Sequence, residues 1–334
     1  MVNSGIINFA FQRFSDADAL PSHLHNCVVA IGNFDGVHRG HQAVLERALE
    51  IAKKEGLPAV VLTFEPHPRS FFRPDEPIDR LTCAVEKAAI LQHMGFDAIV
   101  EQPFTAEFSS RSAEDFVEHI LLERLQARRV VTGYDFHFGK GRRGTPDFLL
   151  EAGKNAGFEV TLVEAFGDEG GEPVSSTRVR NALCAGDVAQ AAGLLGYRYR
   201  FCGEVVHGKK LGRTLGFPTA NMTVSSRASL KEGIYAVRFR RQNGQLFDGV
   251  ASFGRRPTVA SDGSPLLETF LFDFSGDLYG ETACVSFFGY LRGEVKFEGL
   301  DALVAQMKRD EEEARALLAG ARPLSELDHA LSFA

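Results

Sequence analysis

The sequence predicts two domains of different class: an α/β domain built on a parallel sheet, then a small antiparallel β-barrel with a C-terminal helix. In the first half, short apolar runs rich in β-branched residues alternate with helical patterns, which indicates parallel strands joined by helices. From Tyr199 onward the pattern changes to short strands of alternating polarity, which is typical of a barrel. A chain of 334 residues is long enough for two cores. We expect domains at residues 1–185 and 199–334, with a linker at 186–198.

The composition excludes several classes of protein. Hydrophobic residues make up 44% and charged residues 24%, as in ordinary globular proteins, and a net charge of −7 argues against non-specific nucleic-acid binding. The N-terminus has no basic segment followed by an apolar run, and no apolar stretch approaches membrane-spanning length, so we expect neither a signal peptide nor a membrane span. The cysteines are Cys27, Cys83, Cys184, Cys202 and Cys284. Their odd number and wide spacing predict a reducing cytoplasm, with neither a zinc site nor a disulfide framework.

Local patterns place the elements of the first half. Apolar β-branched runs predict strands at residues 27–31, 59–64, 97–100, 129–132 and 159–164. Helical periodicity predicts helices at residues 84–94, 112–125 and 146–156, and after His41, where one face carries Val44, Leu45, Ala48, Leu49 and Ala52. Ser112 is the expected N-cap of its helix, because acidic residues follow in the first turn. Ligands of a parallel sheet bind beyond the carboxyl ends of its strands, so the loops there are the candidate sites.

The turn after the first strand predicts a phosphate site. It reads Gly32-Asn33-Phe34-Asp35-Gly36-Val37-His38-Arg39-Gly40-His41. Its glycines let the backbone turn tightly and approach a ligand closely. The two histidines stand at the start of a helix, where free backbone N–H groups and the positive end of the helix dipole favour an anion. The alternative is an ordinary turn whose histidines only cap the helix.

Three further loops are candidates for the same site. The loop Thr63-Phe64-Glu65-Pro66-His67-Pro68 follows the second strand, and Gly133-Tyr134-Asp135-Phe136-His137-Phe138-Gly139 follows the fourth. In the latter, aromatic rings could stack on a planar ligand, and the basic residues 140–143 could meet phosphate. Ser175-Ser176-Thr177-Arg178 could cap a helix and form a second anion site. The alternatives are a rigid turn, a solvated basic loop and a capped helix with surface arginines.

The second half contains alternating strands and a glycine-rich segment. Tyr235, Val237 and Phe239 alternate with polar or small residues before an Asn243-Gly244 hairpin turn. Further strands are expected at residues 270–274, 282–288 and 289–292, and an amphipathic helix at 300–318. The glycine-rich segment carries Gly203, Gly208, Lys209, Gly212, Arg213, Gly216, Pro218, Thr219 and Asn221. It lacks the Gly-Lys-[Ser/Thr] of a Walker A loop and a following helix, and a β-hairpin loop without function is the alternative.

These motifs resemble those of a known family. His-x-Gly-His after a buried strand is similar to the signature of the nucleotidyltransferase superfamily, and the longer form at residues 32–41 resembles the prokaryotic bifunctional FAD synthetases. The run Gly-Arg-Thr-Leu-Gly-Phe-Pro-Thr-Ala-Asn at residues 212–221 resembles the riboflavin kinase signature. The resemblance covers nearly the whole chain in order. It implies a Rossmann-like FMN adenylyltransferase domain followed by a riboflavin kinase domain.

The resemblance implies roles for the first domain. His38, His41 and Arg178 would be catalytic, and the residues from Gly32 to Gly36 with those from Ser175 to Arg178 would hold ATP. Phe64, His67, Asp135, Phe136 and Phe138 would lie beside FMN. Transfer of an adenylyl group needs two anions held together and the developing phosphate charge stabilised, which histidine, arginine and helix-end amides can do without a covalent nucleophile.

It also implies roles for the second domain. The glycine-rich segment would cover the ATP phosphates, Thr219 and Asn221 would ligate Mg²⁺, and Glu268 would be the base for the ribityl hydroxyl. Asp273 and Asp277 are expected turn residues. Many family members have His where Phe270 stands and Asn where Ser252 stands, which affects only the expected flavin or ADP contacts.

The expected function is therefore two-step flavin cofactor synthesis. Riboflavin and MgATP would give FMN and ADP, and FMN and ATP would give FAD and pyrophosphate. No bound redox cofactor, nucleic acid or membrane is expected to take part, and no oligomeric state is predicted. Two alternatives are an enzyme with one active half and a flavin-binding regulator or carrier that lost turnover.

Overall fold

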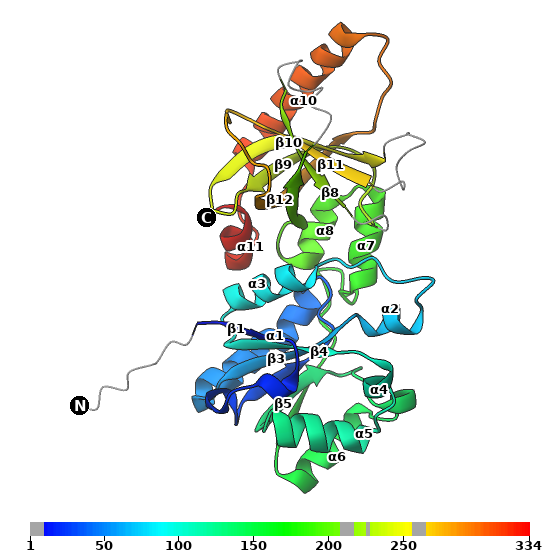
Figure 1. Cartoon of the computed structure of the whole chain (residues 1–334), viewed down its shortest axis with the longest axis vertical. Helices are drawn as coiled ribbons and strands as arrows, with labels where there is room; N and C mark the ends of the chain where they lie inside the picture. The colour runs from blue at the N-terminus through cyan, green and yellow to red at the C-terminus, as the bar shows by residue number, and fades with distance from the viewer. Residues whose placement is uncertain (1–9, 208–216, 225–227, 256–264) are drawn as a thin grey trace, which may run out of the picture. The chain divides into compact units, whose positions relative to one another are not determined.

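Figure 1 shows the computed structural model of the chain, which describes residues 10–207, 217–224, 228–255 and 265–334. Contacts divide the chain into two compact units, Met1–Ile78 with Cys83–Val174 and Asp79–Thr82 with Ser175–Ala334. The short piece Asp79–Thr82 groups with the second unit because Arg180 donates to the Asp79 carbonyl at 2.7 Å and the Ser229 amide donates to its carboxylate at 2.6 Å. The domain limits expected from the sequence, residues 1–185 and 199–334, remain a prediction.

The first unit is built on a six-stranded parallel sheet with the order β1-β4-β3-β2-β5-β6. The strands are β1 (Gln12–Phe14), β2 (Val28–Ile31), β3 (Ala59–Glu65), β4 (Ala98–Pro103), β5 (Arg129–Gly133) and β6 (Glu159–Val163). All four residues of β2 are buried, as expected of a central strand covered on both faces. The parallel α/β prediction is confirmed. The sequence pattern did not indicate β1, which has only three residues and no apolar run.

Helices cover both faces of this sheet, with α1 and α3 on one side and α5 and α6 on the other (Figure 1). The helices are α1 (Arg39–Glu55), α2 (Pro68–Phe72), α3 (Ala84–Met94), α4 (Ala106–Ser109), α5 (Ala113–Asp115), the π-helix η3 (Phe116–Arg124), α6 (Pro146–Ala156) and the 3₁₀ turns η1 (Ala17–Ala19), η2 (Ser22–Leu24) and η4 (Lys140–Arg142). Ser112 is the N-cap of α5, in a reciprocal capping box with Asp115. Helices α1, α3 and α6 end at Gly56, Gly95 and Gly157, each in the left-handed conformation that glycine favours.

The second unit is a closed antiparallel barrel with the strand order β10-β11-β8-β7-β12-β9. Its strands are β7 (Arg200–Val206), β8 (Thr219–Thr223), β9 (Gly233–Arg240), β10 (Leu246–Arg255), β11 (Pro265–Leu271) and β12 (Thr282–Arg292). Leu267, Thr269 and Leu271 of β11 are buried, whereas the residues between them are partly exposed, which is the period of two that barrel strands require. The barrel prediction is confirmed. Strand β11 ends earlier than expected because the chain turns at Asp273, where φ is 56°.

Helices flank the barrel, namely α7 (Ser176–Ala185), α8 (Val188–Leu195), α10 (Leu300–Gly320) and α11 (Glu326–Ser332). The expected closing helix is α10, and its Ala314 and Leu318 pack with Ala236 and Phe272 in one buried cluster. Helix α8 lies in the expected linker, and five of its eight residues are buried. No helix of the described ranges is long and apolar enough to cross a membrane.

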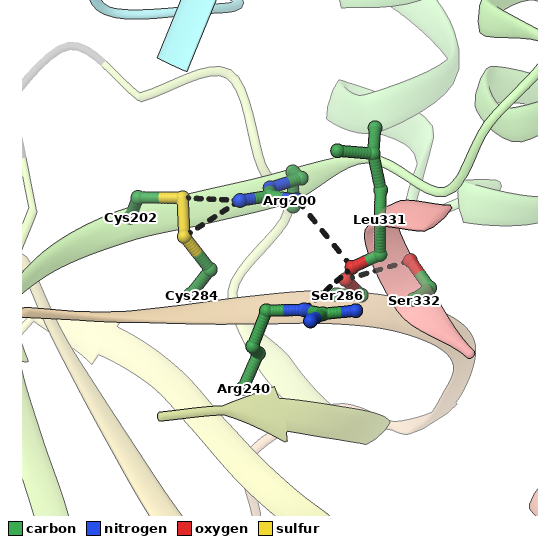
Figure 2. Close-up of a disulfide and its surroundings, with 7 residues drawn as sticks. All are labelled: Arg200, Cys202, Arg240, Cys284, Ser286, Leu331 and Ser332. Atoms are coloured by element: carbon green, nitrogen blue, oxygen red, sulfur yellow. Dashed lines mark hydrogen bonds between the residues drawn. A yellow bond between two sulfur atoms is a disulfide. The ribbon is translucent and has the colours of Figure 1, made fainter. Parts of the chain in front are cut away.

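A disulfide joins Cys202 of β7 to Cys284 of β12 (Figure 2), so the expectation of no disulfide was wrong. The two residues are 82 positions apart in sequence, but they face each other in the antiparallel register with 4.1 Å between their Cα atoms. Sequence spacing did not reveal this pair, because closure of the barrel creates it. Arg200 lies beside both sulfurs, at 3.1 and 2.7 Å, and also donates to the Leu331 carbonyl of α11.

Candidate active sites

The turn between β2 and α1 occupies the centre of the sheet edge. Strands β3, β2 and β5 are neighbours, so the loops that follow these three parallel strands leave the same edge. The chain runs from β2 to β3 and β4 on one side, and β5 and β6 lie on the other side of β2. The turn therefore lies at the switch point of the sheet, which is the usual ligand site of such folds.

This turn has an unusual backbone. Phe34 and Val37 have φ of 47° and 37°, in the left-handed region that costs about 1–3 kcal/mol for such residues. Their side chains are 1% and 0% exposed, so burial holds the backbone in this shape. Gly40 lies in a tight space, because an added Cβ would be 3.0 Å from the Val174 carbonyl and 3.2 Å from the His38 ring. The turn is thus fixed before any ligand arrives.

The two histidines of the turn stack on each other. Their ring centroids are 3.7 Å apart with 16° between the planes. His38 is the N-cap of α1, and its Nδ1 accepts from the His41 backbone N–H at 3.2 Å, so the capping expected of an ordinary turn does occur. Because Nδ1 is the acceptor, Nε2 is the ring nitrogen of His38 that carries a proton.

The imidazole of His41 is held neutral. Burial is the main cause that lowers the pKa of His41 well below its ordinary value. Positive charge at His38, Lys87 and His67 lowers the same pKa further. Its Nδ1 is buried and has no hydrogen-bond partner among the described residues. At neutral pH His41 is therefore an uncharged donor and acceptor.

The other residues predicted for the first site differ in their surroundings. Phe64 and Phe138 belong to the buried core, where Phe138 packs on Phe116 with centroids 4.9 Å apart. Phe136 is partly exposed and stacks on Phe138 at 5.4 Å. His67 caps α2, its Nδ1 accepting from the Arg69 amide, and Asp135 is exposed. Phe136, His67 and Asp135 thus present surface to a ligand, whereas the two core phenylalanines support the loops.

The serine loop belongs to the second unit. Ser175 is the N-cap of α7, and its Oγ accepts from the Arg178 amide at 3.4 Å, as the sequence predicted. Ser176 and Thr177 form the first turn of the same helix. The approach of this loop to the histidine turn remains a prediction.

A second candidate site lies on the barrel, where β10, β11 and β8 run side by side. Glu268 stands directly opposite Asn221 on one side and Ser252 on the other. Directly opposite residues of antiparallel strands point to the same face, about 5 Å apart. Thr219 stands opposite Phe270 in the same register. The barrel therefore brings together the three residues that the sequence predicted for metal binding and base catalysis.

Asn221 has the features of a ligand for a hard cation. Its side chain is 4% exposed, and Nδ2 donates to the Thr219 carbonyl at 3.2 Å. Its Oδ1 is buried and has no hydrogen-bond partner among the described residues. Buried polar atoms are normally paired, so an unpaired amide oxygen fits a bound divalent cation.

The rest of the predicted phosphate segment is described only at its ends. Gly203 lies on β7, and Pro218 precedes β8. Gly208, Lys209, Gly212, Arg213 and Gly216 lie outside the described residues. Phe217 packs on Phe270 with centroids 4.9 Å apart, so Phe270 serves as a packing residue in this structure.

Two charged residues near these sites were not predicted from the sequence. Lys87 is buried beside the histidine turn, and Glu294 lies close enough to Glu268 for the two carboxylates to interact. The pKa of Glu294 is raised by burial, and negative charge at Glu232 and Glu268 adds to this. One signal for Lys87 was available, since it stands among Ala88, Ile90 and Leu91 on a helix whose buried side should be apolar.

Comparison with known proteins gives matches over both halves of the chain. The family model for FAD synthetase matches residues 20–178, and that for riboflavin kinase matches residues 195–318. A bifunctional riboflavin kinase/FMN adenylyltransferase from Pseudomonas fluorescens is 46% identical over 299 residues, which cover 90% of this chain and 95% of the relative. The protein of the same description from Escherichia coli (strain K12) is 42% identical over 299 residues, with 89% and 94% covered.

One solved structure matches nearly the whole fold. It is the crystal structure of a macrolide-efflux protein from Streptococcus pneumoniae, with a TM-score of 0.79 and 34% identity. The match covers 92% of this chain and 99% of that chain.

The state of His41 can be tested by NMR titration of its imidazole, with the resonance assigned by a His41→Gln variant. We expect a midpoint below the ordinary value of about 6.5, because burial and nearby positive charge oppose protonation. As the pH falls, the unfolded chain takes up this proton before the folded chain does. The free energy of unfolding therefore decreases below about pH 6.5. A midpoint at or above 6.5 contradicts the neutral assignment.

Proposed function

This chain belongs to the family of bifunctional riboflavin kinases/FMN adenylyltransferases, and from that premise we propose which of its residues carry each reaction. The protein phosphorylates riboflavin with ATP to FMN and ADP, and it adenylylates FMN with a second ATP to FAD and pyrophosphate. We assign the kinase to residues 199–334 and the adenylyltransferase to residues 1–185. The β8–β11 register is the main support, because it sets the proposed base beside the proposed metal ligand.

For adenylyl transfer, an oxygen of the FMN phosphate attacks the α-phosphorus of ATP. The new P–O bond forms as the bond to the β-phosphate oxygen breaks and pyrophosphate leaves. The FMN phosphate is already ionised, so no base is needed. We assign charge stabilisation to the Nε2–H of His38, to neutral His41 and to the amides of the α1 N-terminus. Arg178 and the hydroxyls from Ser175 to Thr177 are proposed to close over the triphosphate.

For the kinase, Glu268 is the proposed general base. Its carboxylate takes the proton of the ribityl 5′-hydroxyl as that oxygen attacks the γ-phosphorus, and ADP leaves. Enzymes of this family act on ATP together with a divalent cation, and we propose Mg²⁺ held by Thr219 and by Asn221 Oδ1. When bound, such an ion neutralises charge on the phosphates. We also propose that the protein works in the cytoplasm, where small molecules are its only required partners.

Replacing both His38 and His41 with Ala should lower FMN adenylylation by about 10³-fold or more, since each removed donor typically costs about 10²–10³-fold. Riboflavin phosphorylation by the same sample should stay within about twofold, and thermal unfolding shows whether the first unit is folded. The test is incubation with ATP and Mg²⁺ and either riboflavin or FMN, followed by chromatographic separation of the flavins. Loss of both activities in folded protein would argue against separate sites.

The Glu268→Gln substitution keeps the shape of the side chain and removes the base. Riboflavin phosphorylation should then fall by about 10²–10⁴-fold. FMN adenylylation by the same variant should be unchanged, which makes it the matched control. Wild-type kinase turnover in Glu268→Gln would refute the assignment of the base.

A further inference from the structure

Lys87 is a buried lysine that the proposed chemistry does not use. It lies on α3, its side chain is 1% exposed, and its ammonium contacts Asn33, Thr63 and Glu65. Nζ is 2.9 Å from the Asn33 carbonyl, 3.0 Å from Thr63 Oγ1 and 3.5 Å from Glu65 Oε1. Burying an ammonium is costly unless it is paired and hydrogen-bonded, so a lysine in this place requires an explanation.

The contacts of Lys87 join the ends of two neighbouring strands. Asn33 follows β2, while Thr63 and Glu65 lie at the carboxyl end of β3. Thr63 also donates its own hydroxyl to the Asn33 carbonyl at 3.2 Å. The Asn33 carbonyl oxygen therefore accepts from both Lys87 and Thr63, and Lys87 also donates to the Thr63 hydroxyl. This arrangement fixes the peptide where the chain leaves the sheet and enters the histidine turn.

That peptide directly precedes the strained part of the turn. Phe34, the next residue, and Val37 both have a positive φ, and such a backbone persists only where its surroundings hold it. His38 and His41 follow within the same turn. If the Asn33 carbonyl were released, the backbone could relax, and the histidines would move with it. A displacement of about 1 Å at a catalytic group can lower a rate by about 10²-fold.

We propose that Lys87 is a positioning residue for adenylyl transfer, whose ammonium, together with the Thr63 hydroxyl, holds the Asn33 carbonyl and so keeps the histidine turn in its reactive shape. This inference rests on the proposed assignment of adenylyl transfer to that turn. Lys87 acts through the backbone and is not assigned a contact with a reacting atom. Its fixed charge also contributes to keeping His41 neutral.

The test compares Lys87→Met, which keeps the length of the side chain and removes its charge and hydrogen bonds, with Lys53→Met, the same change at an exposed position of α1. We expect Lys87→Met to lower kcat for FMN adenylylation by about 10²-fold, with KM for ATP changed less than about threefold. Lys53→Met should leave both constants unchanged. Riboflavin kinase turnover, measured in the same samples, should be unaffected in both variants.

A second variant separates positioning from folding. Thr63→Val removes the bridging hydroxyl, keeps the shape of the side chain and leaves the lysine in place. It should lower kcat by about tenfold, and the Lys87→Met/Thr63→Val double variant should lose less than the product of the two single losses, because both groups act on one carbonyl. Thermal unfolding of each variant shows whether the first unit is folded at the assay temperature.

Three outcomes overturn the inference. One is adenylylation within twofold of wild type in Lys87→Met, and another is wild-type kcat in folded Thr63→Val. The third is a double variant whose loss of kcat equals the product of the two single losses. Failure of the proposed function looks different, since the wild-type chain would then not convert FMN to FAD, or the His38 and His41 substitutions would leave that conversion intact.

Discussion

The shape of the proposed adenylyltransferase site depends on how the Asn33 carbonyl is held. The Asn33 oxygen accepts from Lys87 and Thr63, and the strained residues Phe34 and Val37 follow it with their side chains buried. His38 then caps α1, and the ring of His41 stacks on the ring of His38. Packing of these side chains in the first unit offsets the strain of the backbone, so the site has its shape before the nucleotide binds. Such preorganised donors are effective because they need little rearrangement during reaction.

The kinase half relies on a different constraint, which is the register of a closed barrel. Antiparallel pairing sets Glu268 opposite Asn221, and the same barrel sets Cys202 opposite Cys284. Neither pair is close in sequence. In both pairs, the hydrogen-bonded register of the strands sets the distance between the two residues, so no loop is needed to bring the side chains together. Under the proposed assignment, adenylyl transfer uses groups at a helix end, whereas the kinase uses groups aligned by strand register.

The sequence was informative where the signal is local. The bounds of α3 and α6, the Ser112 cap and the Asn243-Gly244 hairpin follow from periodicity and turn chemistry within a few residues. The short strand β1, helix α11, the disulfide and the Lys87 contacts were missed, because each depends on residues far away in the chain. Phe64 and Phe138 were predicted to contact FMN, but both lie in the buried core. An aromatic residue beside a ligand loop can stack on a flavin or pack in the core, and the sequence does not distinguish these roles. The fold shows that these two are buried.

The proposed assignment gives one chain two separate sites, with FMN as the product of one and the substrate of the other. It is tested most directly by mixing Glu268→Gln protein with the His38→Ala/His41→Ala protein and supplying riboflavin, ATP and Mg²⁺. Neither variant alone should form FAD, because one cannot make FMN and the other cannot use it. The mixture should form FAD at a rate that increases with the concentration of either chain. FAD production by one variant alone, or none from the mixture, would contradict the account.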